Sequence, residues 1–230
     1  MSKGEYRHEL KFICSEVAMQ LIENKVRHIC YRDPHAGEDG KYRIKSLYFD
    51  TYDDRCYEEN KAGTDNRHKY RIRTYNDDTD VIKLEKKSSL RGLKCKEACN
   101  ITRKQCEQIL TGGAVEDVQP TQEVLEEFLL EKQLLLLSPK VVVEYERTPY
   151  IYQIGNVRIT FDRYITSSDC RDFFERDALG RGIMPQDMHI LEVKYDEILP
   201  YAILELINSS FNLSRTSFSK YALCREYSVR

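Results

Sequence analysis

Basic side chains that alternate with apolar ones between Lys69 and Lys96 are the residues of this chain best suited to chemistry. In the segment KYRIRTY, Lys69, Arg71 and Arg73 share one face of a predicted strand, because successive side chains of a strand point to opposite faces. The next two predicted strands repeat the pattern with Lys83, Glu85, Lys87, Lys94 and Lys96. Guanidinium groups offer a planar fork of donors that matches phosphate oxygens, and lysines act as point charges. Three consecutive strands therefore predict a sheet with one basic face suited to phosphate groups.

The same alternation recurs in most of the other predicted strands. Residues 5–13, 157–164 and 189–196 each place charged side chains on one face and apolar side chains on the other. In the predicted strand at 140–148, Val141, Val143, Tyr145 and Arg147 share one face. The predicted strand at 41–51 differs, because one of its faces changes from charged to apolar along its length. Together these segments indicate about eight strands, most of them antiparallel.

Helices are predicted between these strands. Ser15 and Thr102 are suited to be N-caps, and each precedes apolar residues at helical spacing. Residues 121–139 predict a longer amphipathic helix that a proline ends. The C-terminal part predicts two more helices, the second of which contains Ser219 and Lys220. The whole chain then has four or five helices.

A charged sheet face that looks into bulk water is the simplest interpretation, since antiparallel sheets commonly leave one side wet. That arrangement leaves the amphipathic helices without an apolar surface to cover. If eight strands close into a barrel instead, helices cover its apolar outside and charges line an interior with room for one small ligand. The predicted fold class is therefore α+β, a single domain over residues 1–230 built as an eight-stranded antiparallel β-barrel with helices packed on its outside. Unpaired cations are costly away from water, so this interior predicts a polyanion as its ligand.

The composition restricts the setting of the protein. The formal net charge of −2 argues against a general nucleic-acid surface, which would favour an excess of positive charge. The N-terminal residues lack the apolar core of a secretory signal, which together with the interspersed helices argues against an outer-membrane barrel. The eight cysteines form no CxxC pair and no Cys/His cluster of zinc spacing, so we expect reduced thiols. We expect a cytoplasmic protein with no nucleic-acid partner and no membrane span in this chain.

The order of several short segments resembles a known family. YRHELKF, SLYFDT, KYRIRTY, LEKK, YERT, VRITFD, LEVKY and FSKYAL follow one another as in the catalytic domain of the vacuolar transporter chaperone (VTC) family, over almost the whole chain. These domains are polyphosphate polymerases within the triphosphate tunnel metalloenzymes, whose fold is an eight-stranded antiparallel tunnel. The wider superfamily begins with ExExK, whereas this chain has Arg7 in place of the first glutamate, as the polymerase branch would prefer.

The resemblance also implies the residues of the site. It implies phosphate ligands at Lys11, Arg71, Arg73, Lys87, Lys96, Arg147 and Arg158, assisted by Tyr145, Ser219 and Lys220. Among them, the candidate catalytic residues are Arg71, Arg73, Lys87, Arg147 and Arg158. Glu192 matches the metal-binding glutamate of the family, and hard cations such as Mn²⁺ or Mg²⁺ suit a carboxylate.

Some assignments stay open at this point. An internal salt bridge to Lys194 is the alternative role for Glu192, and Lys94 competes with Lys96 for its place in the interior. The three remaining carboxylates of the charged faces either assist the metal or balance the basic interior: Glu9, Glu85 and Asp162.

Phosphoryl transfer needs positioning and charge neutralisation more than covalent chemistry from the protein. With what the resemblance implies, the predicted function is a metal-dependent polyphosphate polymerase, which moves the γ-phosphoryl group of ATP or another nucleoside triphosphate onto a polyphosphate chain. A triphosphatase of the same fold is the first alternative, and the small number of carboxylates available to activate water disfavours it. A module that binds polyphosphate, triphosphate or a nucleotide without turnover is the second, and Glu192 speaks against it because anion binding needs no carboxylate.

Overall fold

The strands with alternating charged and apolar residues pair into one antiparallel sheet in the computed structural model, which describes residues 5–175, 180–208, 213 and 215–228. Along the sheet the order of its eight long strands is β1-β10-β8-β7-β3-β4-β5-β6. In chain order they are β1 (His8–Ser15), β3 (Tyr42–Asp50), β4 (Arg67–Tyr75), β5 (Asp78–Leu90), β6 (Leu93–Ile101), β7 (Ser138–Tyr152), β8 (Val157–Ser168) and β10 (Met188–Tyr195). Two short strands extend the sheet beside β7 and β8, namely β2 (Tyr31–Arg32) and β9 (Arg181–Gly182).

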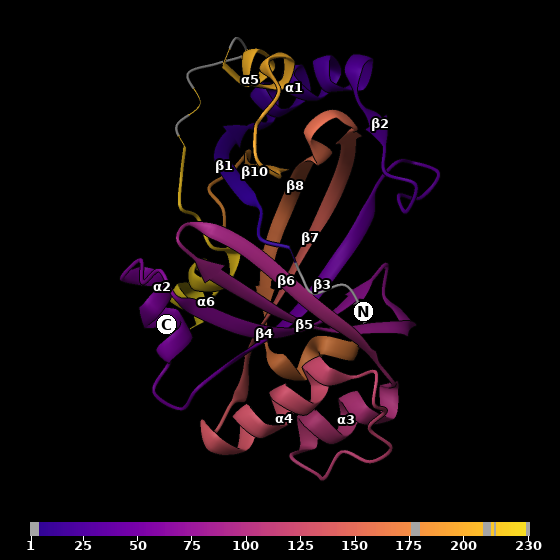
Figure 1. Cartoon of the computed structure of the whole chain (residues 1–230), viewed down its shortest axis with the longest axis vertical. Helices are drawn as coiled ribbons and strands as arrows, with labels where there is room; N and C mark the ends of the chain where they lie inside the picture. The colour runs from indigo at the N-terminus through magenta and orange to yellow at the C-terminus, as the bar shows by residue number, and fades with distance from the viewer. Residues whose placement is uncertain (1–4, 176–179, 209–212, 214, 229–230) are drawn as a thin grey trace.

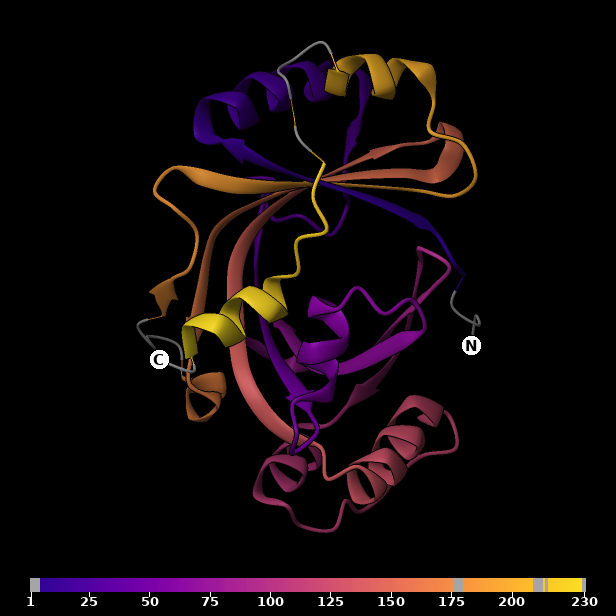
Figure 2. The ribbon, with the colours of Figure 1, turned by 90° about the vertical axis from the view of Figure 1, so that its left-hand side faces the viewer.

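The sheet curls until its first and last strands meet at one bridge. Arg7, just before β1, and Lys94 of β6 exchange two backbone hydrogen bonds, each 2.9 Å long. Figure 2 shows the curl, with β7 as a long, strongly curved strand that rises from the α3 and α4 end of the molecule. The predicted eight-stranded antiparallel barrel is confirmed, and β1 and β6 pair along very little of their length.

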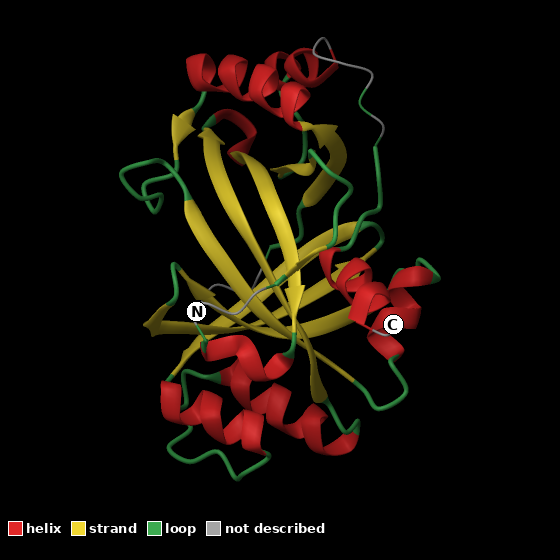
Figure 3. Ribbon diagram, turned by 180° about the vertical axis from the view of Figure 1, so that it is seen from behind, coloured by secondary structure: helices red, strands yellow, loops and turns green. Residues whose placement is uncertain are grey.

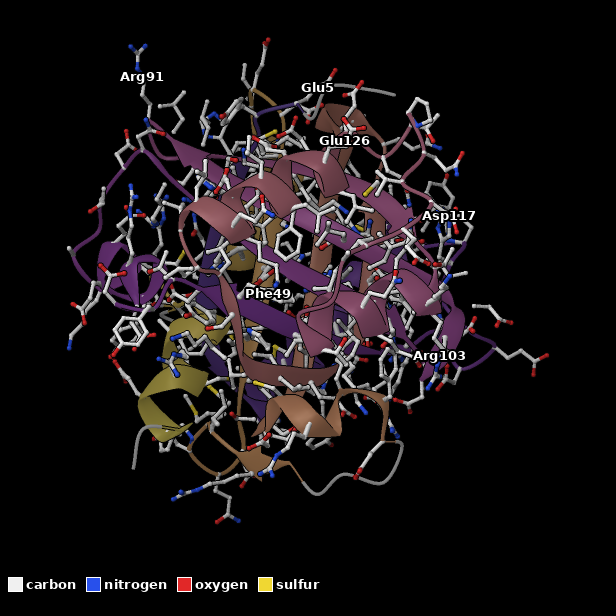
Figure 4. The ribbon with its side chains drawn as sticks, turned by 90° about the horizontal axis from the view of Figure 1, so that it is seen from below. Glu5, Phe49, Arg91, Arg103, Asp117 and Glu126 are labelled. Atoms are coloured by element: carbon white, nitrogen blue, oxygen red, sulfur yellow. The ribbon has the colours of Figure 1, made fainter. Side chains whose placement is uncertain are left out.

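Helices cover the apolar outside of this sheet at both ends of the molecule (Figures 1 and 3). Helix α1 (Glu16–Ile29) and helix α5 (Tyr201–Asn208) form one apolar cluster with β1, β8 and β10, in which Ile22 and Phe161 are fully buried. Helix α3 (Arg103–Thr111) and helix α4 (Glu123–Leu134) form another with β3 to β6. Figure 4 looks onto this second layer from below, with Phe49 near its centre. No helix among the described residues is both long enough and apolar enough to cross a membrane.

Two helices begin at the N-cap residues predicted from the sequence, whereas one helix ends earlier than predicted. The hydroxyl of Ser15 accepts a hydrogen bond from the backbone of Ala18, and Thr102 forms a reciprocal capping box with Gln105, as N-caps should. The helix predicted to reach Pro139 ends at Leu134 instead. The backbone turns at Leu136, which has a φ of 52°, so the run of leucines leads from helix into strand β7.

A buried carboxylate joins the end of β3 to helix α2 (Arg55–Lys61) and helix α6 (Lys220–Ser228). Asp50 is completely buried and accepts hydrogen bonds from the backbone N–H groups of Thr51, Cys56 and Tyr57 at 2.8, 2.8 and 3.0 Å. The hydroxyl of Tyr221, in the first turn of α6, donates to the same carboxylate. Asp50 therefore holds the start of α6 in place, next to Ser219 and Lys220.

We predict that Asp50→Asn lowers the free energy of unfolding by about 2–3 kcal/mol, because an amide keeps only part of the charge-assisted hydrogen bonding of a carboxylate. For a chain of this size that is a fall in melting temperature of roughly 5–10 °C. Thermal unfolding of the purified proteins measures it, with Asp80→Asn on the exposed start of β5 as the matched control. Equal melting temperatures for the two variants would contradict the role assigned to Asp50.

Candidate functional site

The inner face of the curled sheet lines a cavity of about 500 Å³, hereafter the central cavity. Every long strand contributes to the wall of this cavity, and helix α6 adds Lys220 and Tyr221. All the predicted site residues line it: Lys11, Arg71, Arg73, Lys87, Lys96, Tyr145, Arg147, Arg158, Glu192, Ser219 and Lys220. The alternative of a solvated sheet face is wrong, since Arg73 is only 5% exposed and Glu85 is fully buried. The chemical roles of these residues stay predictions.

Asp162 and Glu192 are the carboxylates at the centre of a first ionic group beside this cavity. Glu192 lines the cavity wall, and Asp162 is fully buried. Arg147 grips Asp162 with two parallel hydrogen bonds of 2.6 and 2.7 Å, and its Nη2 also donates to Glu192 at 3.4 Å. The ammonium nitrogen of Lys220 lies 2.6 Å from an oxygen of each carboxylate. One cation from a helix therefore sits between two acidic side chains from neighbouring strands, β8 and β10.

Glu85 is the centre of a second group, on strands β4 to β6. Its Oε2 accepts from Nη2 and Nε of Arg71 at 2.6 and 2.7 Å, and Nη1 of Arg73 lies 3.8 Å away. Lys96 donates to the other carboxylate oxygen at 3.0 Å. The remaining guanidinium nitrogen of Arg71 donates to the hydroxyl of Tyr48 at 2.9 Å. A single buried anion thus holds two arginines and a lysine in place.

Glu9 is the centre of a third group, on strands β1, β5 and β10. Its carboxylate lies 3.2 Å from Nζ of Lys11, 3.1 Å from Nζ of Lys87 and 3.4 Å from Nζ of Lys194. Lys194 is therefore a partner of Glu9, and the salt bridge to Lys194 that we considered for Glu192 is not formed within 4 Å. Lys11 links this group to the first one, since its ammonium lies 3.9 Å from Glu192.

Arg158 and the hydroxyl groups complete the wall. Arg158 is more exposed than Arg71, Arg73 and Arg147, with 38% of its side chain accessible. It pairs with Asp33 at 2.6 Å and donates to the Tyr42 hydroxyl at 3.0 Å. The hydroxyl of Tyr145 accepts from Arg73 at 3.3 Å. The hydroxyl of Ser219 caps α6 by accepting from the backbone N–H of Ala222 at 3.3 Å.

The four carboxyl groups at the centres of these ionic groups are held in their charged form. Burial by itself would raise the pKa of each, but the cations beside Glu9, Glu85 and Glu192 lower the pKa of these three well below the usual range. Arg147 and Lys220 likewise overcome burial and lower the pKa of Asp162. Each carboxylate is thus already engaged by cations, and none is poised to take up a proton near neutral pH.

Three residues of the wall lie outside the predicted set of site residues, namely Lys69, Lys194 and Tyr48. Lys69 donates to the Ser219 hydroxyl at 3.2 Å, and its ammonium lies 5.1 and 5.6 Å from the ring centres of Tyr221 and Tyr48. Strand alternation did place Lys69 on the basic face with Arg71, but the family resemblance did not select it as a site residue. Lys194 alternates with Glu192 in the same way. Tyr48 carried no signal, because its strand shows charge on the opposite face.

The choice between Lys94 and Lys96 needs no decision, because both line the central cavity. Lys94 donates to the Ser89 hydroxyl at 2.5 Å, whereas Lys96 pairs with Glu85 and keeps half of its side chain exposed. Both follow from strand alternation on β6, which places residues two apart on one face.

The donor set beside Lys220 fits a divalent cation such as Mn²⁺ or Mg²⁺. Asp162 and Glu192 each place an oxygen 2.6 Å from the same ammonium nitrogen, so two hard ligands converge on a point where a positive charge already sits. Such metals are commonly held by one or two carboxylates together with substrate phosphates. No group of three or more potential metal-binding side chains occurs within the described ranges, so the phosphates would have to complete the coordination.

Comparison with known proteins agrees with this architecture. A family model described as the VTC domain matches residues 6–229, and no curated protein matches by sequence. Among solved structures, the putative adenylyl cyclase HpAC1 from Hippeastrum is similar, with a TM-score of 0.55 and 15% identity over 97% of this chain and 96% of that chain. A putative adenylate cyclase of Bacillus halodurans gives a TM-score of 0.52 and 12% identity over 85% and 83% of the two chains. The PH1819 protein of Pyrococcus horikoshii OT3 gives 0.50 and 17% over 96% and 99%. At this level of identity, the similarity to these three structures concerns the fold alone.

We predict that binding of tripolyphosphate takes up a proton through Lys194. Burial and the nearby Lys87 lower the pKa of Lys194 to about 7 although Glu9 opposes the shift, so at pH 8 the amine is mostly neutral. An anion favours the ammonium form and raises this pKa, so affinity should decrease as the pH rises through about 7.

Calorimetry at pH 8 in two buffers of different ionisation enthalpy measures the proton uptake. The ligand titrates too, so the informative quantity is the difference between the wild type and Lys194→Met, which should be up to one proton smaller in the variant. Identical uptake by two proteins with equal melting temperatures would show that Lys194 does not titrate with binding.

Proposed function

The chain belongs to the VTC domain family, and from that premise we propose that it is a polyphosphate polymerase, which transfers the γ-phosphoryl group of ATP or another nucleoside triphosphate onto a polyphosphate chain. The observation that carries the proposal is the charge of the central cavity. Three arginines with little exposure converge on it, each already making the kind of contact that a phosphate oxygen would accept: Arg71, Arg73 and Arg147. A cavity with so many buried cations suits a ligand that carries one negative charge or more per phosphate.

The residues of the cavity would act by position and by charge. Arg71, Arg73 and Arg147 would hold the phosphates in line, so that a terminal oxygen of the polyphosphate chain attacks the γ-phosphorus. The bond to the bridging oxygen breaks as the new bond forms, and ADP leaves with the electron pair. Lysines along the wall would neutralise the charge that is spread over the phosphoryl oxygens. A divalent cation held at Asp162 and Glu192 would add Lewis-acid stabilisation of the phosphate oxygens.

The state of the carboxylates favours a phosphate acceptor over water. A hydrolase needs a base or a metal-bound hydroxide to activate its water, and the carboxylates at the centres of the three ionic groups are each committed to two or more cations. A terminal phosphate oxygen is already an anion and needs no base.

A triphosphatase is the second candidate, for a specific reason. The structural relative HpAC1 is described as having a dominant triphosphatase activity, and its chain superposes on nearly all of this one. With 15% identity the likeness concerns the fold, so it makes water a plausible acceptor to test and assigns no activity by itself.

Incubation of the purified protein with ATP and Mn²⁺ separates the candidates when polyphosphate, ADP and free phosphate are followed independently. A polymerase releases ADP and incorporates an equal amount of phosphate into polyphosphate. Free phosphate in step with nucleotide consumption would identify a triphosphatase and contradict the proposal. Unchanged ATP, with binding of the nucleotide still measurable, would identify a module that binds without turnover.

We predict that Glu192→Gln lowers turnover at least about 100-fold, a change of about 2.7 kcal/mol in the activation barrier, because the amide cannot anchor a divalent cation through charge. Turnover as a function of Mn²⁺ concentration is the measurement, with Glu126→Gln on the exposed face of α4 as the control. Melting temperatures should accompany it, since the substitution also leaves Arg147 and Lys220 with less compensating charge. Wild-type turnover at low Mn²⁺ would show that Glu192 serves only as an ionic partner.

A further inference from the structure

The loop between β2 and β3 brings a buried carboxylate to one arginine of the central cavity. Strands β2 and β3 pair in turn with β7, and between them the chain leaves the sheet after Arg32 and returns to it at Tyr42. Asp33 and Tyr42 thus stand at the two ends of one loop. Both meet the same side chain of β8, since Oδ2 of Asp33 lies 2.6 Å and the hydroxyl of Tyr42 3.0 Å from Nη2 of Arg158. One nitrogen of Arg158 is therefore held from both ends of the loop.

Asp33 is itself fixed from several sides. Its side chain is only 2% exposed, and its other oxygen lies 2.9 Å from the backbone nitrogen and 3.0 Å from Nδ1 of His35. The backbone N–H of Asp33 donates to the carbonyl of Pro149 on β7 at 3.3 Å. Burial alone would raise the pKa of Asp33, but the backbone N–H of His35 and the guanidinium of Arg158 lower it. The loop therefore presents a charged carboxylate in one fixed place.

The contacts of Nη2 leave the other donors of this guanidinium available. The two hydrogens of Nη2 lie in the guanidinium plane, so an ion pair with Asp33 and a hydrogen bond to Tyr42 on that nitrogen fix the plane. Nε of Arg158 is buried and has no hydrogen-bond partner among the residues that the structure describes. In Arg71, Arg73 and Arg147 the same nitrogen donates to a carboxylate or a hydroxyl, at distances between 2.6 and 3.0 Å. A buried donor without an acceptor is costly, so it points to an acceptor that arrives with a ligand.

We propose that Asp33 is a positioning residue, which holds Nη2 of Arg158 so that the remaining donors of the guanidinium meet phosphate oxygens in the central cavity. The inference rests on the proposed function for the role of Arg158 as a phosphate ligand. Arg158 lines the central cavity and Asp33 does not, so Asp33 acts through the arginine and not on the ligand. Asp33 also differs from Glu85, which takes both Nε and Nη2 of Arg71. A phosphate can therefore bind Arg158 while the contact with Asp33 stays in place.

A double-mutant cycle on the affinity for tripolyphosphate, measured by calorimetry, tests this role. Asp33→Asn should weaken binding about tenfold, because the guanidinium is no longer held in one plane, and Arg158→Met should weaken it at least as much. In a protein that already carries Arg158→Met, Asp33→Asn should change the affinity by less than about twofold, since two residues that act through one contact are not additive. Asp39→Asn is the matched control, because Asp39 is exposed on the same loop and accepts a hydrogen bond only from the backbone of Lys41.

Melting temperatures accompany the titrations, because Arg158→Met leaves the buried Asp33 without its cation. If that variant does not fold, Arg158→Lys takes its place in the cycle, since an ammonium keeps the charge but has no plane to orient.

Equal losses from Asp33→Asn with and without Arg158 would overturn the inference, because they would mean that Asp33 supports only the fold. Tighter binding by Asp33→Asn would overturn it too, since Asp33 would then withhold the arginine from the ligand. Wild-type affinity in either single variant would also contradict it. None of these results depends on turnover, so a protein that shows the expected coupling yet makes no polyphosphate would retain the role of Asp33 and lose the proposed polymerase activity.

Discussion

Compensation of buried positive charge is the constraint on which this structure depends. Glu9, Glu85, Asp162 and Glu192 each hold two or more lysines or arginines around the central cavity. Moving so many cations out of water would be prohibitive without anions placed among them. The same contacts show what an incoming phosphate chain must do, since it has to take over donors that carboxylates now occupy. Affinity then reflects an exchange of anions, and release of product is easier than the number of cations would suggest.

The fold makes this arrangement possible by separating two kinds of surface. On most strands, alternation sends charges inward and apolar groups outward, where α1, α3, α4 and α5 bury them, whereas β3 turns Tyr42, Ile44 and Tyr48 inward. Helix α6 contributes differently, because it packs against β7 and β8 and brings Lys220 to the two carboxylates of its group. Asp50 fixes the first turn of α6 through Tyr221, so a residue outside the cavity determines where one of its cations lies.

Strand alternation accounts for how much could be predicted from the sequence. It places a side chain on the inner or outer face, and the resemblance then selected residues that do line one cavity, such as Arg73 and Glu192. It does not tell which strands meet around a barrel, so the pairing of Glu9 with Lys87 and Lys194 could not be foreseen. Tyr48 escaped notice because a tyrosine on an apolar face gives no charge signal. The run of leucines after Leu134 continues the apolar pattern of the helix, so the sequence predicted a longer helix than α4.

If phosphate oxygens replace the buried carboxylates as acceptors for the arginines and lysines of the central cavity, a crystal structure with tripolyphosphate and Mn²⁺ will show the exchange most directly. The account predicts phosphorus atoms in the central cavity between Arg71, Arg73 and Arg147. It also predicts that the 2.6 Å contact of Arg71 with Glu85 lengthens or breaks as a phosphate oxygen replaces the carboxylate. A triphosphate bound only on the outer surface, with that contact unchanged, would contradict the account.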